Sequence, residues 1–290
     1  MRTKQEMLEL ILNVAGKDER IRAVAMNGSR TNPRAPVDPF QDYDIVYLVS
    51  EMDSFLRDPH WVDVFGERII MQTPEDMNLF PPSLGGRFTY LMLFTDGNRI
   101  DLMLAPVEDQ EAYCQEDKLT LVLLDKDQSL PHVPAPTDED YWIQRPSSEF
   151  FADCCNEFWW VSTYVAKGLW RQEILYAQDH LHQVMRPMLI KMLEWQVGIQ
   201  TDFSVSAGKN GKYLQKYMSE PQWNELLSTF CKGDYEEVWR ALFAMCRLFR
   251  SSAFFVADHF GFAYPQQDDQ RVTAYLKHVH ALSPHAETIF

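Results

Sequence analysis

The sequence of residues 21–49 is IRAVAMNGSRTNPRAPVDPFQDYDIVYLV, and this stretch decides how the first part of the chain folds. Apolar residues dominate near both of its ends, over 21–26 and 43–49, where they predict two β-strands. Three prolines fall between these runs, so the connecting segment is neither a helix nor a central strand. The stretch therefore predicts two strands joined by a loop, with the polar residues beside the loop gathered at one end of a sheet.

Asp42 and Asp44 stand at the start of the second apolar run. Residues two apart in a strand share a face, so we expect both carboxylates to point the same way. Two carboxylates aimed at one point repel each other unless a cation lies between them, and oxygen ligands of this kind suit Mg²⁺. An Asp-x-Asp pattern alone is weak, because two surface acids at a strand end or turn produce it as well.

Gly28, Ser29 and Arg30 follow the first apolar run directly. The Ser29 hydroxyl and the loop amides beside Gly28 can hold phosphate groups, and glycine lets the backbone approach a ligand closely. Arg30 has two interpretations, a phosphate contact or an ion pair with an acid such as Asp44. These residues make the two aspartates a stronger signal than they are alone.

A third acid, Asp101, lies on a later predicted strand. An apolar run over 88–94 is followed by a strong hairpin turn at Asp96-Gly97 and by a return strand over 99–104. An acid inside a hydrophobic strand is costly to bury unless it is paired or bound to a metal. Three convergent carboxylates near a Gly-Ser loop describe a nucleotidyl-transfer site.

With these motifs in this order, the chain resembles the nucleotidyltransferase superfamily to which DNA polymerase beta belongs. It resembles more closely the aminoglycoside 6-adenylyltransferases, also called streptomycin adenylyltransferases. The stretches that carry this resemblance are residues 19–22, 28–32, 40–45, 123–127 and 154–159. They occur in both halves of the chain, so the resemblance is more specific than one short motif.

The distribution of patterns predicts an α+β fold with two domains. Strand-length apolar runs alternate with helical patterns in the first half, and the hairpin makes the expected sheet mixed. A linker over 126–136 contains three prolines and marks a boundary. We expect a nucleotidyltransferase domain over 1–136, with a mixed β-sheet flanked by helices, and an α-helical domain over 137–290 that contacts substrate and nucleotide.

The second half shows helical spacing throughout, which favours a C-terminal helical bundle. Residues 150–170 predict one aromatic-rich helix, and 173–197 predict a second long helix that Pro187 should kink. Lys167 lies near the end of the first of these helices. The resemblance favours a triphosphate contact for Lys167, and the alternative is a cation that stabilises the helix C-terminus. Glu157 is a candidate for a substrate cation or a proton, and the alternative is a surface acid.

Charge and composition limit the classes of partner. The formal net charge is −15, which argues against a nucleic-acid groove because such a groove needs basic residues to neutralise phosphates. An acidic cleft would concentrate a cationic substrate, although solubility alone also explains the charge. A hydrophobic content of 46% supports a sizeable core in a globular protein.

The expected location is the cytoplasm, without a membrane partner. No apolar run approaches the roughly 20 residues that a membrane-spanning helix needs, and the N-terminus has no apolar signal region. The chain has five cysteines, and an odd count without a secretion signal favours reduced thiols.

The resemblance implies Mg²⁺-dependent transfer of AMP from ATP to a hydroxyl of an aminoglycoside, with streptomycin and its 6-hydroxyl as the expected acceptor. Pyrophosphate would leave, and the product would confer antibiotic resistance. Asp42, Asp44 and Asp101 are the expected catalytic and metal-binding residues, and Asp101 has a second possible role as general base. Alternative hypotheses are a protein or RNA acceptor, or a catalytically silent nucleotide-binding module.

Overall fold

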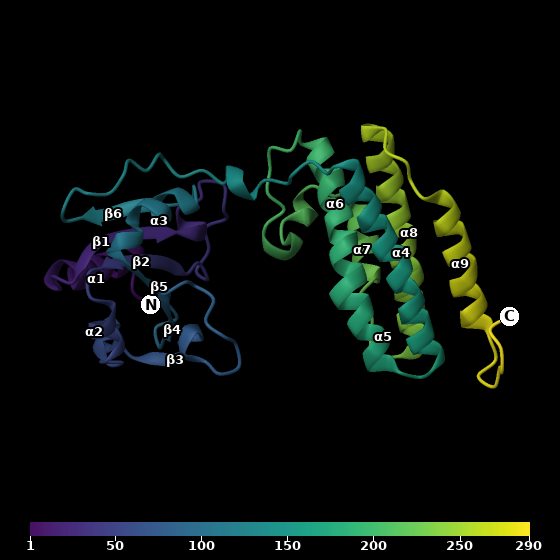
Figure 1. Cartoon of the computed structure of the whole chain (residues 1–290), viewed down its shortest axis with the longest axis horizontal. Helices are drawn as coiled ribbons and strands as arrows, with labels where there is room; N and C mark the ends of the chain where they lie inside the picture. The colour runs from purple at the N-terminus through teal and green to yellow at the C-terminus, as the bar shows by residue number, and fades with distance from the viewer. The chain divides into compact units, whose positions relative to one another are not determined.

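The computed structural model describes residues 1–290, which divide into two compact units, Met1–Asp140 and Tyr141–Phe290 (Figure 1). The strands of the first unit are β1 (Ile21–Asn27), β2 (Tyr43–Val49), β3 (Arg68–Gln72), β4 (Phe88–Phe94), β5 (Arg99–Pro106) and β6 (Leu121–Asp125). Its helices are α1 (Lys4–Lys17), α2 (Met52–Leu56) and α3 (Gln110–Glu116). The second unit is entirely helical.

The six strands form one sheet in the order β3-β4-β5-β2-β1-β6. β2 and β5 run parallel, and the other neighbouring strands are antiparallel, so the sheet is mixed as the sequence predicted. The Asp96-Gly97 turn joins β4 to β5, and Gly97 has a φ of +85° there. The parallel pair brings the start of β2 beside the start of β5.

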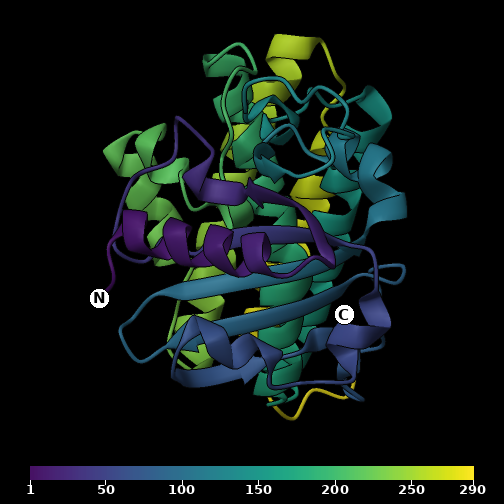
Figure 2. The same cartoon turned by 90° about the vertical axis from the view of Figure 1, so that its left-hand side faces the viewer.

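Helix α1 lies across one face of the sheet (Figure 2). Met7, Ile11 and Ala15 recur at four-residue spacing along α1 and are fully buried. The Tyr47 hydroxyl on β2 donates a hydrogen bond of 2.7 Å to the Ile11 carbonyl. A second apolar cluster contains Ala23 and Ala25 of β1, Val46 and Leu48 of β2, Ala105 of β5 and Tyr113 of α3. Alternate strand residues therefore pack against α1 and α3, which leaves the strand ends free for the loops.

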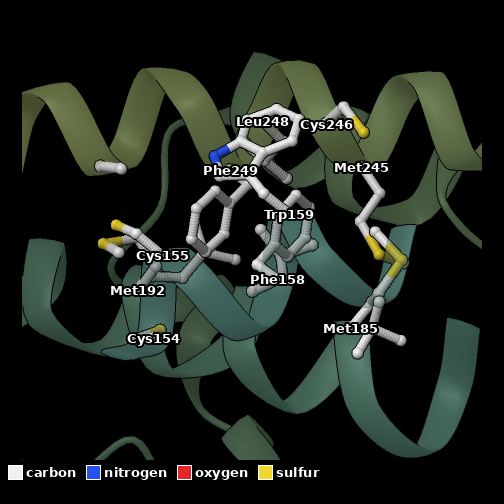
Figure 3. Packing of buried hydrophobic residues seen from close by; sticks show 14 of the residues in the cluster. Cys154, Cys155, Phe158, Trp159, Met185, Met192, Met245, Cys246, Leu248 and Phe249 are labelled. Carbon is white, nitrogen blue, oxygen red and sulfur yellow. The ribbon is translucent and has the colours of Figure 1, made fainter. Parts of the chain in front are cut away.

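The second unit contains α4 (Ser148–Trp170), α5 (Ile174–His180), α6 (Arg186–Gln200), α7 (Glu220–Ser228), α8 (Tyr235–Phe260) and α9 (Gln266–Ala281). Its core forms where α4, α6 and α8 pack together. The rings of Phe158 on α4 and Phe249 on α8 stack in parallel with their centroids 3.7 Å apart, and Trp159 lies edge-on to both (Figure 3). These aromatic contacts between distant segments confirm the predicted helical bundle.

The region of Pro187 differs in detail from its prediction. The sequence predicted one helix over 173–197 with a kink at Pro187, whereas the structure has a π-helical turn, Leu181–Met185, between α5 and α6. Proline has no N–H and its ring crowds the carbonyl four residues earlier. One wide turn immediately before Pro187 accommodates this irregularity within an otherwise continuous helix.

No helix in the structure combines the length and the apolar character needed to cross a membrane. All five cysteines are free thiols. Burial raises the pKa of the Cys154 thiol to about 12, so this group stays protonated at neutral pH.

Candidate active site

Asp42, Asp44 and Asp101 form one cluster at the shared end of β2 and β5. Their carboxylate oxygens lie within 4.8 Å of one another, and all three residues are half-buried. The parallel register pairs Asp44 directly with Asp101, and Asp42 immediately precedes β2 on the same side. The convergence expected from the two-residue spacing is therefore present, and the β2–β5 pairing supplies the third carboxylate.

The turn after β1 lies against this cluster. Gly28, Ser29 and Arg30 form a single 3-10 turn, and the antiparallel register pairs Asn27 with Asp44. Gly28 adopts a φ of +72°, a left-handed conformation that favours glycine. The turn brings the backbone of Gly28 directly against the Asp44 carboxylate.

Arg30 holds the chain segment that carries Asp42. Its Nε donates to the Asp42 carbonyl at 2.8 Å and its Nη2 donates to the Gln41 carbonyl at 2.7 Å. The guanidinium group also lies over the Tyr43 ring, 3.7 Å from its centroid. Arg30 therefore anchors the backbone ahead of β2 and forms no ion pair with Asp44.

The electrostatic environment disfavours three ionised carboxylates. Burial, followed by the charges of Asp42 and Asp101, raises the pKa of Asp44 to about 7. Arg99 and Arg30 act in the opposite direction but do not cancel the effect. The donor set consists of oxygens alone and carries surplus negative charge, which fits a hard divalent cation such as Mg²⁺.

Arg99 is a member of the site that the sequence analysis missed. Its Nε donates to Asp101 Oδ1 at 2.7 Å and its Nη2 donates to Oδ2 at 2.6 Å. This two-point ion pair offsets the cost of an acid within β5 and fixes the orientation of its carboxylate. The Arg-x-Asp spacing in a strand places both side chains on one face, so the signal was present in the sequence.

A cleft of about 330 Å³ opens beside Asp44 and Asp101. Its wall includes Tyr113 of α3, whose hydroxyl donates to Asn27 Oδ1 at 2.6 Å. The Asn27 amide in turn donates to Thr120 Oγ1 at 2.8 Å. These bonds fix α3 and the end of β1 around the cleft, and its other polar wall residues are Arg87, Thr89, Glu116 and Asp117.

The profile of the streptomycin adenylyltransferase family matches residues 1–279. The chain belongs to this family. An aminoglycoside 6-adenylyltransferase from Bacillus subtilis is 48% identical over 270 residues, which cover 93% of this chain and 95% of the relative. The Campylobacter jejuni enzyme of the same name is 46% identical over 93% of each chain. A crystal structure of the aminoglycoside 6-adenyltransferase from Bacillus subtilis, 43% identical, aligns with a TM-score of 0.49 over 97% of this chain and 100% of that one.

The resemblance stated from the motifs is thus confirmed, and the protein is an aminoglycoside nucleotidyltransferase. The family membership agrees with the clustered carboxylates, because nucleotidyl transfer needs charge control at a phosphate. It does not by itself assign a role to each residue.

Two candidate residues of this adenylyltransferase lie on α4 in the second unit. Glu157 is exposed, and Lys167 is half-buried with its ammonium group 4.7 Å from the centroid of the Tyr164 ring. Ten residues separate the two along the helix, which is about 15 Å of axial rise. They therefore cannot contact the same atom of a small ligand, and any roles they have are distinct.

Proposed function

We propose that the enzyme transfers AMP from ATP to the 6-hydroxyl of streptomycin in a Mg²⁺-dependent reaction that releases pyrophosphate and confers resistance. The observation that carries this proposal is the cluster of Asp42, Asp44 and Asp101 against the Gly28 turn. The names of the family and of its relatives support the acceptor class.

Asp42, Asp44 and Asp101 are the residues that would hold Mg²⁺. When bound there, the ion would neutralise the charge that builds on the phosphates during transfer. The carboxylates themselves repel phosphate, so the metal-free cluster disfavours ATP.

Asp101 has a second possible role, because it borders the open cleft and is held by Arg99. A carboxylate fixed in orientation can accept the proton of the attacking hydroxyl, provided that the hydroxyl comes within hydrogen-bond reach. In this role Asp101 Oδ takes the proton as the acceptor oxygen attacks the α-phosphorus, and pyrophosphate departs with the electron pair of the broken bond.

The turn at Gly28, Ser29 and Arg30 is proposed to position the β- and γ-phosphates. The backbone amides and the Ser29 hydroxyl are donors that a phosphate chain can accept, and the close approach of Gly28 leaves no side chain in the way. Arg30 contributes by fixing the loop ahead of Asp42, as its two bonds to backbone carbonyls indicate. Lys167 is the proposed triphosphate contact from the second unit.

Residues 1–136 are proposed to carry the transfer chemistry, and 137–290 to supply contacts to substrate and nucleotide. Streptomycin carries guanidinium groups, which pair with carboxylates through two parallel hydrogen bonds. Glu157 is exposed and is a candidate for such a pair. The net charge of −15 would attract a cationic antibiotic and repel nucleic acid. We also propose a cytoplasmic location, which agrees with the five free thiols.

The test is to incubate the enzyme with ATP, Mg²⁺ and streptomycin and to identify the product by mass spectrometry and NMR. An AMP adduct on the 6-hydroxyl supports the proposal, and kanamycin, which has amines but no guanidinium groups, serves as the comparison acceptor. An adduct on a different hydroxyl would correct the regiochemistry. ATP binding without any adduct would favour a silent nucleotide-binding module or a protein or RNA acceptor.

A further inference from the structure

A groove of about 470 Å³ lies between α8 and α9 in the second unit. Helix α9 packs against α4. Arg250 on α8 pairs with the buried Asp269 of α9, and Tyr264 and Thr273 also hydrogen-bond to that carboxylate. This network fastens the N-terminal part of α9 to α8, and the groove opens along the next turns of the two helices.

The charge of the groove is opposite to that of the chain. Arg247 and Arg250 line it from α8, and Lys277 and His280 line it from α9. None of its lining residues is acidic, although the chain as a whole has a net charge of −15. A local concentration of basic side chains on such an acidic protein is a specific feature and not a consequence of overall composition.

The basic side chains differ in how far they are already neutralised. Arg250 is already paired with Asp269, and His280 Nε2 lies 3.2 Å from Glu236 Oε2. Arg247 is exposed and reaches Glu225 only at 3.5 Å. Lys277 is exposed and forms no ion pair. Arg247 and Lys277 can therefore pair with an added anion without breaking the bonds that hold α8 to α9.

The floor of the groove is apolar and partly aromatic. It is formed by Phe243 and by the buried Cys246. The Phe243 ring stacks on Trp239, and His280 lies over both rings, with centroid distances of 4.7 Å to Trp239 and 5.7 Å to Phe243. Ligand pockets commonly combine an apolar floor with a few charged groups that fix the orientation of the ligand.

We propose that this groove is a second binding site, separate from the carboxylate cluster, for a small anion that has a flat apolar body. The apolar body lies against Phe243 and Cys246, and the anionic group pairs with Arg247 and Lys277. A nucleoside monophosphate and an aromatic carboxylate share this chemistry, whereas inorganic phosphate offers only the anionic group.

The site can be probed in the full chain with anilinonaphthalene sulfonate, a fluorescent aromatic anion. Titration is carried out on the wild type, on the double variant Arg247→Gln/Lys277→Gln, and on Arg240→Gln. Arg240 is exposed on α8 and pairs with Glu237 but does not line the groove, so it controls for the loss of a surface charge. All three substituted side chains are exposed, so the variants keep the fold.

The double variant should bind the probe about fivefold or more weakly, since two charge-assisted contacts are lost, and Arg240→Gln should bind as the wild type does. Displacement of the probe by AMP or by 2-naphthoate, weakened in the double variant, then identifies the natural class, and displacement by neither would count against the proposal. The proposal is overturned if the wild type does not bind the probe or if the double variant binds it equally well. Equal displacement by inorganic phosphate would also overturn it, because the apolar body would then be irrelevant.

Discussion

The carboxylate of Asp44 lies so close to the backbone of Gly28 that a Cβ atom at position 28 would overlap Oδ2 and stand only 2.9 Å from Cγ. Gly28 thus serves two purposes, since it also adopts a positive φ of +72°. The turn and the acid form one unit, in which the position of the carboxylate depends on the absence of a side chain opposite it.

Replacing Gly28 with alanine should therefore displace the Asp44 carboxylate and strain the turn. We expect activity to fall by about 100-fold, the cost of a misplacement of about 1 Å. Stability should fall by about 1–2 kcal/mol because of the left-handed conformation. Steady-state kinetics and thermal denaturation measure the two effects.

Gly97→Ala is the matched control for this substitution. Gly97 has a similar positive φ of +85°, but a Cβ atom at this position would have no neighbouring atom within 4 Å. The variant should lose stability and keep its activity. Equal activity losses in the two variants would show that strain, and not the contact with Asp44, explains the effect.

Asp44→Asn should stabilise the metal-free protein at neutral and higher pH. The folded-state pKa of Asp44 is raised to about 7, whereas that of an unfolded aspartate is near ~4. The folded protein therefore binds the extra proton between these values, and wild-type stability falls as pH rises through this window. In thermal denaturation with EDTA, the melting temperature of the variant relative to that of the wild type should rise from about pH 4 to 7. A difference between the two that does not change with pH would contradict the assignment.

Adding Mg²⁺ should make the wild type more stable than Asp44→Asn. The ion should raise the melting temperature of the wild type at a pH of about 7.5 and release protons on binding, since it favours ionised Asp44. Asp44→Asn should show a much smaller shift. An equal shift in both proteins would place the metal elsewhere.

Arg99→Gln tests a positioning residue. Without its two bonds to Asp101 the carboxylate loses its fixed orientation, so kcat should fall by about 10- to 100-fold with little change in KM for ATP. Arg22→Gln is the control, because Arg22 of β1 forms a comparable two-point ion pair with Asp127, which lies just beyond β6. A rise in KM with unchanged kcat would indicate that Arg99 contributes only to ATP binding.

Phe249→Ala should destabilise the second unit by about 3–5 kcal/mol, because it removes a fully buried ring that stacks on Phe158. All tryptophans except Trp61 lie in that unit, so tryptophan fluorescence during urea denaturation measures its unfolding. Phe254→Ala, on the same helix with 42% exposure, should cost much less. Similar losses in both variants would contradict the assignment of Phe249 to the core.

The strands and turns of the first unit could be predicted from the sequence because short local patterns specify them. The apolar run that begins beside Asp44 and the Asp-Gly turn at Asp96 each determine structure over a few residues. The direct pairing of Asp44 with Asp101 depends on the strand order β5-β2, which the local patterns do not specify. Arg99 was overlooked because a strand-end arginine usually faces solvent.

The contacts between distant segments could not be predicted from the sequence. Tyr113 and Asn27 are 86 residues apart and meet only after α3 has packed on the sheet. The groove beside Lys277 likewise depends on how α9 packs, which helical periodicity does not specify. Near Pro187 the sequence indicated an irregular helix, but either a kink or a π turn accommodates the absence of the proline N–H.

We propose that the carboxylate cluster performs adenylyl transfer to streptomycin. The most direct measurement is pyrophosphate release from Mg²⁺-ATP, with and without streptomycin, by the wild type and by Asp42→Asn. We predict release that depends on streptomycin in the wild type and is almost abolished in a variant that melts at a similar temperature. Two results would contradict the account: near-normal pyrophosphate release by folded Asp42→Asn, or pyrophosphate release by the wild type that is the same with and without streptomycin.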